Sequence, residues 1–499
     1  MKENFSLCPK SEKAAASGGK RCLGALAQLN APARASLFYT VGSIASRGAA
    51  FLLTPILTRL LSKTDYGAYS LFNSTLAILT LFGTLDICGS VFWRSMQKFE
   101  GERRQLLRSA LLLISGLSTV TYSVYIILLS IMGHGEIFRG ANYILLPLLI
   151  ANGTVNLYAT RCRFSSRYIF PLASSVILGV IAPAIACLTA ALAGGHSEDA
   201  LLFKVGTTSA ITVAMALPLF IYIIFRKRVT EGNEKNNTSV HIKYILSLAL
   251  PMLPYYISLS TLAQGDKLII SRLLGEGALA SYAVAYSAGN GLTALTAGLI
   301  QALSPWIMRK VRSGKHRSCI EVTDRLTVII ASGTVLFLCF APELFSFLAP
   351  LGYSEGLPCL FPVALSAIPL FLSTLLSSAS LTETSPIGIA ISGIIPAAVS
   401  LVLCFLLIGR YGIISAAIIT AISYILLFLL LALNLKLKGA ALPVNVSKAL
   451  QVFLFTATVA GLIFTMRDLL LLRIITALLS LSVIIYTAYK SKALLKEES

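Results

Sequence analysis

The sequence predicts an all-α, polytopic membrane protein with about fourteen transmembrane helices, arranged as two related six-helix lobes and a C-terminal helix pair. The 499 residues are 56% hydrophobic and only 12% charged, whereas soluble domains carry about 25% charged residues. Apolar runs long enough to cross a bilayer recur along the chain, and basic residues gather in alternate connections between them. This composition excludes a disordered chain and argues against a soluble enzyme or a secreted disulfide scaffold.

Fourteen apolar runs could each cross a hydrocarbon core about 30 Å thick as a helix. They are too long for the strands of a membrane barrel and lack the alternation that such strands show. The first run is also too long for a signal-peptide core, so we interpret it as a membrane anchor. The limits of the runs are 36–61, 67–93, 106–132, 141–160, 170–194, 201–225, 243–273, 279–308, 320–349, 358–381, 386–409, 412–435, 449–466 and 470–489.

The basic residues predict how these helices are oriented. If the N-terminus is cytoplasmic, 31 of the 41 Lys and Arg residues fall on the cytoplasmic side and 8 on the outer side, and only Arg47 and Lys267 remain inside runs. This bias is the one that the positive-inside rule describes, and it predicts that both termini lie in the cytoplasm. We therefore interpret the net charge of +20 as topology signals and contacts to anionic membrane lipids, and we predict no nucleic-acid partner.

An internal repeat relates the first two runs to the seventh and eighth. At an offset of 213 residues, six of nineteen positions are identical: Ile56 with Ile269, Arg59 with Arg272, Leu60 with Leu273, Leu61 with Leu274, Tyr69 with Tyr282, and Ser74 with Ser287. Six helices separate the pairs, so both run in the same direction and predict a parallel repeat with a substrate cavity at the interface of the lobes. The predicted units are a cytoplasmic basic tail (1–35), an N-terminal lobe (36–225), a cytoplasmic linker (226–242), a C-terminal lobe (243–437), and a final helix pair with a cytoplasmic tail (438–499).

Four ionisable side chains stand out inside the apolar runs, where such groups are costly and usually functional. Arg47 and Lys267 are candidates for holding an anionic group in the cavity, and the forked guanidinium of Arg47 suits phosphate. Asp86 and Asp266 are candidates for carrying a coupling proton or sodium ion. A structural alternative pairs Arg47 with either aspartate, and Lys267 with its neighbour, as ion pairs.

Polar residues form a stripe in both members of the repeat. Tyr282, Tyr286 and Asn290 recur at helical spacing in the eighth run, and Tyr69 and Asn73 do so in the second. Hydroxyls, amides and aromatic rings suit a sugar, so we predict that these stripes bind substrate. Hydrogen bonding between helices uses the same residue types and is the alternative.

Several other sites are not expected. No cysteine and histidine cluster with metal spacing appears, and no phosphate-binding GxxxxGK[ST] loop is present, so we expect no metal or other cofactor beyond H⁺ or Na⁺ coupling. We assign all four histidines to loops and predict no buried histidine relay. No predicted outer loop exceeds about 20 residues, which argues against a membrane glycosyltransferase or polymerase with an external acceptor site.

Four segments resemble the O-antigen and capsule-repeat flippases of the multidrug/oligosaccharidyl-lipid/polysaccharide exporter superfamily. Residues 59–70 (RLLSKTDYGAYS) look like the turn between their first two helices, and residues 250–254 (LPMLP), 265–270 (GDKLII) and 280–286 (ASYAVAY) look like the start of their second lobe. Members typically have Asp-Arg where this chain has Asp266-Lys267, which keeps both charges but weakens bidentate phosphate binding.

The resemblance implies a non-enzymatic flippase that moves an undecaprenyl-diphosphate-linked oligosaccharide from the inner to the outer leaflet, for O-antigen, capsule or exopolysaccharide synthesis. Polysaccharide polymerase and export proteins would be further partners. Two alternatives remain at this point. An ion-coupled multidrug/cation antiporter shares the architecture but needs an acidic, aromatic cavity. An integral-membrane glycosyltransferase or polymerase belongs to a different class and would transfer sugar itself.

Overall fold

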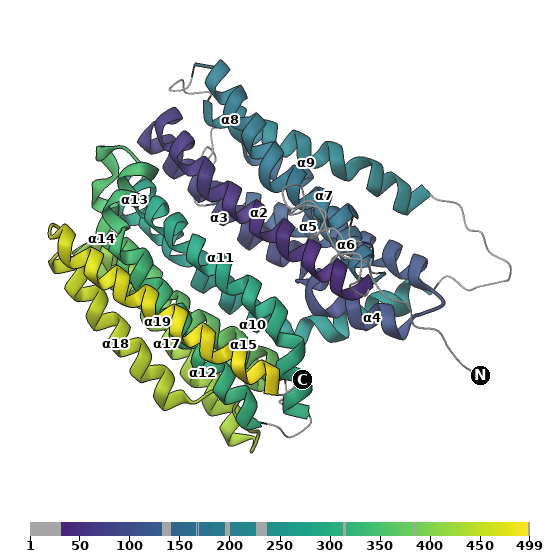
Figure 1. Ribbon diagram of the computed structural model, residues 1–499. Helices are drawn as coiled ribbons and strands as arrows, with labels where there is room; N and C mark the ends of the chain where they lie inside the picture. The colour runs from purple at the N-terminus through teal and green to yellow at the C-terminus, as the bar shows by residue number, and fades with distance from the viewer. Residues whose placement is uncertain are drawn as a thin grey trace, which may run out of the picture.

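The computed structural model describes residues 31–131, 141–165, 167, 169–194, 200–225, 237–312, 316–383 and 386–497, and these residues form helices and no strand. Figure 1 shows long helices that run roughly along one common direction, with the first half of the chain on one side and the second half on the other. The predicted all-α membrane class is confirmed. Most of the predicted basic tail (1–30) and of the linker (226–236) lies outside the described residues.

The N-terminal half consists of helices that follow the first six apolar runs. Two of these runs are interrupted by wide π-helical turns, η1 and η2. The elements are α2 (Ala31–Leu60), α3 (Lys63–Thr84), η1 (Ile87–Val91), α4 (Phe92–Lys98), α5 (Arg103–Ile131), α6 (Asn142–Phe164), α7 (Ile169–Val176), η2 (Ile177–Ile181), α8 (Ala182–Leu192) and α9 (Ala200–Phe225).

The C-terminal half follows the remaining eight runs. The tenth run is divided by a break at Ser366, and the short helix α13 ends the ninth. The elements are α10 (Thr238–Leu274), α11 (Glu276–Arg312), α12 (His316–Cys339), α13 (Ala341–Leu348), η3 (Leu351–Gly356), α14 (Leu357–Leu365), α15 (Ala367–Glu383), α16 (Pro386–Tyr411), α17 (Ile413–Leu437), α18 (Val446–Thr465) and α19 (Leu470–Glu497).

Eleven helical stretches of the described chain are long and apolar enough to cross a membrane, so the predicted count of fourteen is not confirmed. Helices α2, α3 and α11 are not among the eleven. Their sequences contain many glycine, hydroxyl and amide residues, which lower their hydropathy. These three helices also pack against one another, α11 against α3 and α2. The stretches with the weakest apolar signal are therefore the ones that meet between the two halves.

The second run is not one continuous helix, contrary to the prediction. Leu85 and Asp86 both have φ of 47°, in the left-handed region that non-glycine residues rarely occupy. This break separates α3 from η1 and α4. The turn is compact, because the Gly89 N–H bonds the Asp86 carbonyl at 3.0 Å and a Cβ on Gly89 would lie 2.6 Å from the Asp86 carboxylate. Asp86 therefore lies at a kink rather than inside a regular helix.

The turn between helices falls at equivalent places in the two halves. α3 begins at Lys63 after the capping residue Ser62, and α11 begins at Glu276 after Gly275, 213 residues later. Gly275 has φ of 83°, which favours glycine, whereas Ser62 caps α3 by accepting a hydrogen bond from the Asp65 N–H at 3.1 Å. Different turn chemistry thus serves the same position of the proposed repeat.

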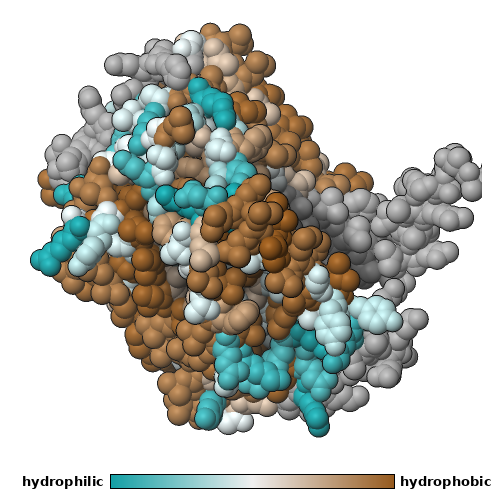
Figure 2. All heavy atoms as spheres, turned by 60° about the vertical axis from the view of Figure 1, so that its left-hand side comes forward, coloured by the Kyte–Doolittle hydropathy of each residue, from teal (hydrophilic) through white to brown (hydrophobic). Residues whose placement is uncertain are grey.

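The outer surface is apolar, as a bilayer requires. Figure 2 shows brown side chains over most of the face in view, with teal side chains gathered toward its upper part and its lower edge. Large exposed apolar residues lie on helices of both halves, for example Val124 on α5, Phe405 on α16 and Leu479 on α19. Contiguous exposed apolar surface of this extent is typical of a lipid-facing protein.

The last two helices pack on α12, and one ion pair anchors α19. The Arg473 guanidinium, 7% exposed, donates to both Glu343 carboxylate oxygens at 2.7 and 2.8 Å and to the Cys339 carbonyl at 3.0 Å. Glu343 lies on α13, between two membrane-spanning stretches. The hydrogen bonds from Arg473 hold the pKa of the Glu343 carboxyl below its ordinary value.

This pair predicts an acid-dependent loss of stability. Because the folded-state pKa of Glu343 is depressed, its contribution is present above the unfolded pKa of about 4.3 and is lost as pH falls through the folded value. We expect Glu343→Gln to lower stability at pH 7.5 by about 0.5–1 kcal/mol and to reduce the fall in melting temperature between pH 7.5 and pH 4. Thermal unfolding of the purified protein measures both. Glu100→Gln, at an exposed ion pair with Arg103, is the control, and equal behaviour of the two variants would contradict the prediction.

Candidate functional site

A cavity of about 660 Å³ lies between α2 of the first half and α10, α11, α15 and α17 of the second. Its wall is mainly aromatic, hydroxyl and amide side chains with a few aliphatic ones. The lining residues are Arg47, Ala50, Phe51, Met252, Tyr255, Tyr256, Leu259, Ala263, Gln264, Tyr286, Ser287, Asn290, Gly291, Thr293, Leu370, Ser373, Thr374, Ser377, Tyr424 and Leu427.

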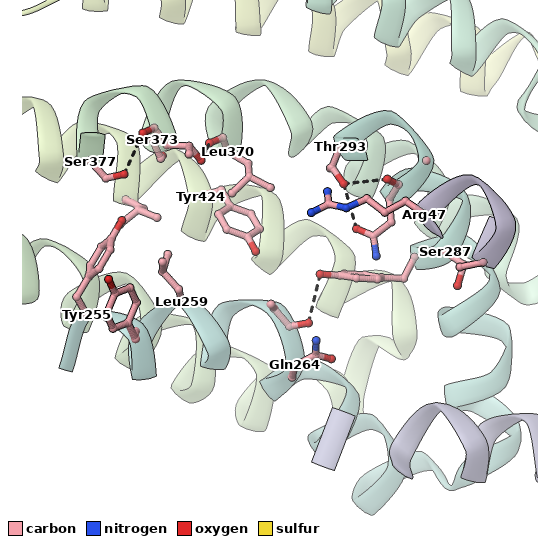
Figure 3. A pocket seen from close by; sticks show the side chains of 18 of the residues that line it. Arg47, Tyr255, Leu259, Gln264, Ser287, Thr293, Leu370, Ser373, Ser377 and Tyr424 are labelled. Carbon is pink, nitrogen blue, oxygen red and sulfur yellow. Dashed lines mark hydrogen bonds between the residues drawn. The ribbon is translucent and has the colours of Figure 1, made fainter. Parts of the chain in front are cut away.

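Arg47 is the one charged side chain among the described residues that line the cavity. It is exposed, and Figure 3 shows its guanidinium extending from α2 into the space between Thr293 and Tyr424. No carboxylate is among the lining residues. The cavity is therefore electropositive and offers a forked donor to an anion.

Two further predicted substrate residues line the same cavity. Tyr286 donates its hydroxyl hydrogen to the Ala263 carbonyl at 3.2 Å, so its ring is fixed against α10. Asn290, one turn further along α11, is exposed to the cavity and accepts a hydrogen bond from the Thr293 hydroxyl at 3.4 Å. The helical spacing of the eighth run thus brings these two side chains to one face of α11, opposite Arg47.

Lys267 lies one layer behind the wall. It is buried, and its ammonium donates to the Gln264 amide oxygen at 2.9 Å and lies 3.9 Å from the centroid of the Tyr286 ring. Both of those residues line the cavity. Lys267 therefore adds positive potential to the wall and fixes Gln264 and Tyr286, without itself reaching the cavity surface.

Asp266 is the centre of a buried polar cluster beside Lys267. Its carboxylate accepts hydrogen bonds from the Tyr282 hydroxyl, from the Lys267 backbone N–H at 2.8 Å and from the Thr420 hydroxyl at 3.3 Å. Asp266 is 3% exposed and Tyr282 is 0% exposed. Tyr282 thus donates a hydrogen bond to Asp266 and does not line the cavity. The cluster joins α10, α11 and α17.

Tyr69, Asn73 and Asp86 do not line this cavity. The Tyr69 hydroxyl and the Asn73 side-chain amide are hydrogen-bonded to each other on α3, and neither residue is among those that line the cavity. The carboxyl of Asp86, at the kink after α3, is hydrogen-bonded to Tyr256, whose ring does line the cavity. Of the predicted residues, the structure therefore places Arg47, Tyr286 and Asn290 at the cavity wall. The predicted residues of α10 lie behind the wall with Tyr282, and those of α3 lie outside it.

Sequence reasoning missed two buried cationic or titratable groups. Lys204, one of the 8 basic residues that the charge bias assigns to the outer side, is 0% exposed inside the first lobe, where it donates to the Pro183 carbonyl at 2.8 Å and to the Cys187 sulfur at 3.3 Å. It lies in the first turn of the sixth apolar run, a position that did not indicate burial. His241 was assigned to a loop, and that prediction is wrong.

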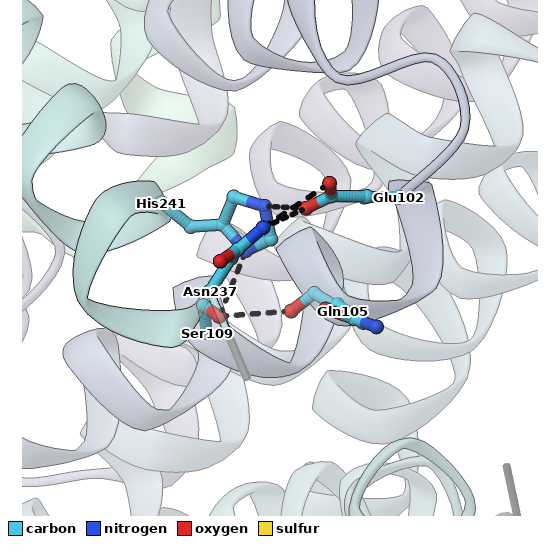
Figure 4. A network of polar contacts seen from close by, with 5 residues as sticks. All are labelled: Glu102, Gln105, Ser109, Asn237 and His241. Atoms are coloured by element: carbon cyan, nitrogen blue, oxygen red, sulfur yellow. Dashed lines mark hydrogen bonds and ion pairs between the residues drawn. The ribbon is translucent and has the colours of Figure 1, made fainter. Parts of the chain in front are cut away.

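His241 is buried in the first turn of α10 and connects the two halves (Figure 4). Its Nε2 lies 2.7 Å from a Glu102 carboxylate oxygen, and its Nδ1 lies 3.4 Å from the Ser109 hydroxyl. The Asn237 amide also donates to Glu102 at 3.3 Å. Helix α10 begins at Thr238, five residues before the apolar run, because its first turn extends beyond the hydrocarbon. Hydropathy alone therefore did not reveal that His241 lies in a helix.

The opposite end of the bundle holds a second set of contacts between the halves. The Thr58 hydroxyl donates to the Leu348 carbonyl at 2.7 Å, and Lys63 lies 3.8 Å from Glu355. Backbones meet where α3 and α11 begin, because a Cβ on Gly67 would lie 2.0 Å from the Glu276 carbonyl oxygen. The charge bias predicts that this end faces outward, so the structure is closed on the predicted outer side.

The Gly67 contact predicts a local opening. We expect Gly67→Ala to force α3 away from α11, because the clashing atom is backbone and has no rotamer to adopt. Hydrogen exchange should then increase in the first turns of both helices, with a loss of stability of about 1–3 kcal/mol. Gly277→Ala, where an added Cβ meets nothing within 4 Å, is the control. Unchanged exchange in Gly67→Ala would show that the two helices do not pack this closely.

Comparison with solved structures defines the fold. The lipid II flippase MurJ, in an inward closed conformation, matches with a TM-score of 0.65 and 13% identity over 92% of this chain and 100% of that chain. An outward-facing multidrug resistance MATE transporter matches with a TM-score of 0.57 and 14% identity, over 83% and 98%. A mutant of the Vibrio cholerae MATE transporter VcmN matches with a TM-score of 0.52 and 15% identity, over 83% and 97%. No curated protein sequence matches the chain.

The described residues thus form a multi-pass, helical membrane protein whose fold is similar to that of MurJ and of the MATE transporters. Residues 33–310, more than half of the chain, match the family described as polysaccharide biosynthesis protein. The chain belongs to this polysaccharide biosynthesis family.

Proposed function

We propose that this protein is a flippase that moves an undecaprenyl-diphosphate-linked oligosaccharide from the inner to the outer leaflet of a bacterial cell membrane, for surface polysaccharide synthesis. The observation that carries the proposal is the charge of the cavity. The Arg47 guanidinium points into the cavity, and no carboxylate is among the described residues that line it. An anionic diphosphate needs such a partner when it leaves water. Membership of the polysaccharide biosynthesis family supports a glycan as the cargo.

The wall chemistry supports a division of the substrate within the cavity. Arg47 would hold the diphosphate, while Tyr286 and Asn290 on α11 and the hydroxyls of α15 would bond and stack against the sugars. Tyr69 and Asn73, on α3, would join the substrate path only after the two halves move relative to each other. The lipid chains would remain in the bilayer outside the cavity, because 660 Å³ is too small for them.

Alternating access would use the contacts at the two ends of the bundle. The contacts of Thr58, Lys63 and Gly67 close the predicted outer end and would have to separate for release of the glycan. The Glu102–His241 contact at the predicted cytoplasmic end would separate in the opposite half of the cycle. Asp266 is the candidate for the coupling H⁺ or Na⁺, since it is buried and its hydrogen-bond donors are neutral. Asp86 remains a second candidate at the kink after α3.

A multidrug/cation antiporter is the alternative, because MATE transporters share the fold. Such a cavity needs negative charge to hold a cation. Arg47 is the charged lining group here, which disfavours this alternative. A sugar-transferring enzyme is disfavoured by the family and by the fold.

Reconstitution tests the proposal. Purified protein in liposomes should expose an internally placed undecaprenyl-diphosphate-linked oligosaccharide to a membrane-impermeant glycosidase added outside, and empty liposomes should not. Ethidium uptake by the same liposomes tests the antiporter. Release of undecaprenyl diphosphate, the group left when the oligosaccharide is transferred to another glycan, tests an enzyme. Ethidium transport without glycan exposure would replace the proposal by the antiporter, and sugar transfer in place of exposure would replace it by the enzyme.

A further inference from the structure

A second cavity, of about 200 Å³, lies in the first half of the chain, away from the substrate cavity. It lies where α5 begins and α6 ends, with one side chain from α9. The residues that line it are Arg104, Tyr158, Arg161, Cys162, Ser165, Arg167 and Tyr222. None of them lines the first cavity. The charge bias of the sequence places this end of the bundle at the cytoplasmic surface of the membrane.

Three guanidinium groups share this small cavity with three hydroxyl groups, and no carboxylate is among the lining residues. Arg104 and Arg167 lie close enough to Arg161 for their charges to repel its own. Such repulsion costs free energy that a bound anion would offset, and guanidinium groups bond tetrahedral oxyanions through paired donors. The combination of Arg, Tyr and Ser is that of a phosphate site.

Local packing holds two of the arginines in place. The Arg161 guanidinium lies over the Tyr158 ring, 5.8 Å from its centroid, and that ring meets the Tyr222 ring edge-on at 6.4 Å. After α6 the chain turns back, because the Arg167 N–H bonds the Cys162 carbonyl at 2.8 Å. This turn brings Arg167 beside Arg161 although the helix has ended. The cavity is thus built by aromatic contacts and a fixed turn.

The surroundings favour a lipid over a soluble phosphate. Exposed apolar side chains flank the cavity on α9 and α7: Ile221, next to Tyr222, is 47% exposed, and Phe225 and Ile169 are each 73% exposed. At about 30 Å³ per water-sized group, the volume holds a phosphate and its ester atoms, roughly six or seven such groups. Acyl or prenyl chains would then lie along the apolar surface outside.

We propose that Arg104, Arg161 and Arg167 form a binding site for the phosphate headgroup of a cytoplasmic-leaflet lipid, separate from the substrate cavity. The shared chemistry is a phosphate ester carrying a long apolar chain. Its source is either an anionic phospholipid of the bulk membrane or a polyprenyl phosphate. The site would fix the first half of the chain against the inner leaflet while the second half moves.

The test is lipid binding to the purified full-length protein, measured by native mass spectrometry with phosphatidylglycerol and, separately, undecaprenyl phosphate. We expect saturable binding of at least one lipid and an affinity about tenfold lower in Arg104→Gln/Arg167→Gln. Both arginines are exposed, so this variant should fold. The matched control is Lys436→Gln/Lys438→Gln, which removes two exposed charges at the end of α17 and should bind as the unmodified protein does.

The two lipids distinguish the sources. Loss of phosphatidylglycerol binding in the arginine variant assigns the site to bulk phospholipid, and loss of undecaprenyl phosphate binding assigns it to a polyprenyl lipid. Arg161→Lys keeps the charge and removes the forked guanidinium. It should lower the affinity for the same lipid by a smaller factor than the double-glutamine variant does. Equal binding of both lipids by the arginine variant and the lysine control would overturn the proposal. So would binding of inorganic phosphate as tight as that of either lipid.

Discussion

Replacing Arg47 by alanine is expected to reduce glycan translocation in reconstituted liposomes by at least about 30-fold. This corresponds to about 2 kcal/mol, the lower end of the cost of truncating one partner of a desolvated charge pair. The physical reason is that Arg47 is the charged group of the cavity wall. Without it, a diphosphate would enter a cavity lined by neutral groups, and the Lys267 ammonium would remain behind the wall, bonded to Gln264.

Two further variants separate charge from geometry. Arg47→Lys keeps the positive charge but loses the fork, so translocation should fall by an intermediate factor. Arg410→Ala removes an exposed arginine at the end of α16, far along the chain from the cavity wall, and should leave translocation unchanged. Translocation by Arg47→Ala at the rate of the unmodified protein would show that Arg47 does not bind the diphosphate, whatever the other variants do.

Replacing Asp266 is expected to have the second large effect on translocation. Two substitutions separate the contribution of Asp266 to stability from its proposed role in ion coupling. Asp266→Ala deprives the buried Tyr282 hydroxyl of its carboxylate acceptor, whereas the Thr420 hydroxyl keeps the Ala416 carbonyl at 2.9 Å. A buried donor left unpaired costs about 1–3 kcal/mol. We therefore expect Asp266→Ala to be strongly destabilised and inactive, as measured by thermal unfolding and translocation.

Asp266→Asn isolates the coupling role. The amide oxygen can still accept the hydrogen bond from Tyr282, so stability should fall far less than in the alanine variant. The carboxylate is lost, so the residue can neither release a proton nor attract Na⁺. We expect translocation by Asp266→Asn to become independent of an imposed proton or sodium gradient. A gradient response equal to that of the unmodified protein would assign coupling to another group, with Asp86→Asn as the next variant to measure.

The class of the molecule and the identity of most of its helices followed from hydropathy, because a bilayer constrains helix length directly. The count of fourteen is not confirmed, because α2, α3 and α11 carry polar residues in place of apolar ones where the two halves meet, and their hydropathy is correspondingly low. The kink at Leu85 and Asp86 was also missed. Neither residue is a glycine or proline, so the sequence has no local sign of a break there.

The site was foreseen in part, for reasons that individual residues illustrate. Tyr286 and Asn290 share a face of α11 by helical spacing, and Arg47 stands out as a charge inside an apolar run, so all three could be named before the structure. Helical periodicity predicts which residues share a face of a helix, but it does not predict which other helix packs against that face. It therefore did not reveal that Tyr282 bonds Asp266, or that Gln264 lies between Lys267 and the cavity.

The most direct test of the central claim is whether water reaches the cavity wall from one side of the membrane. Asn290→Cys, in a background without the native cysteines, should react with a membrane-impermeant maleimide added at the cytoplasmic face, and undecaprenyl-diphosphate-linked oligosaccharide should slow the reaction. Phe405→Cys, on an exposed apolar position of α16, is the lipid-facing reference and should not react. An Asn290→Cys protein that reacts no faster than this reference from either side would mean that the seam between the two halves is dry, and the account would fail.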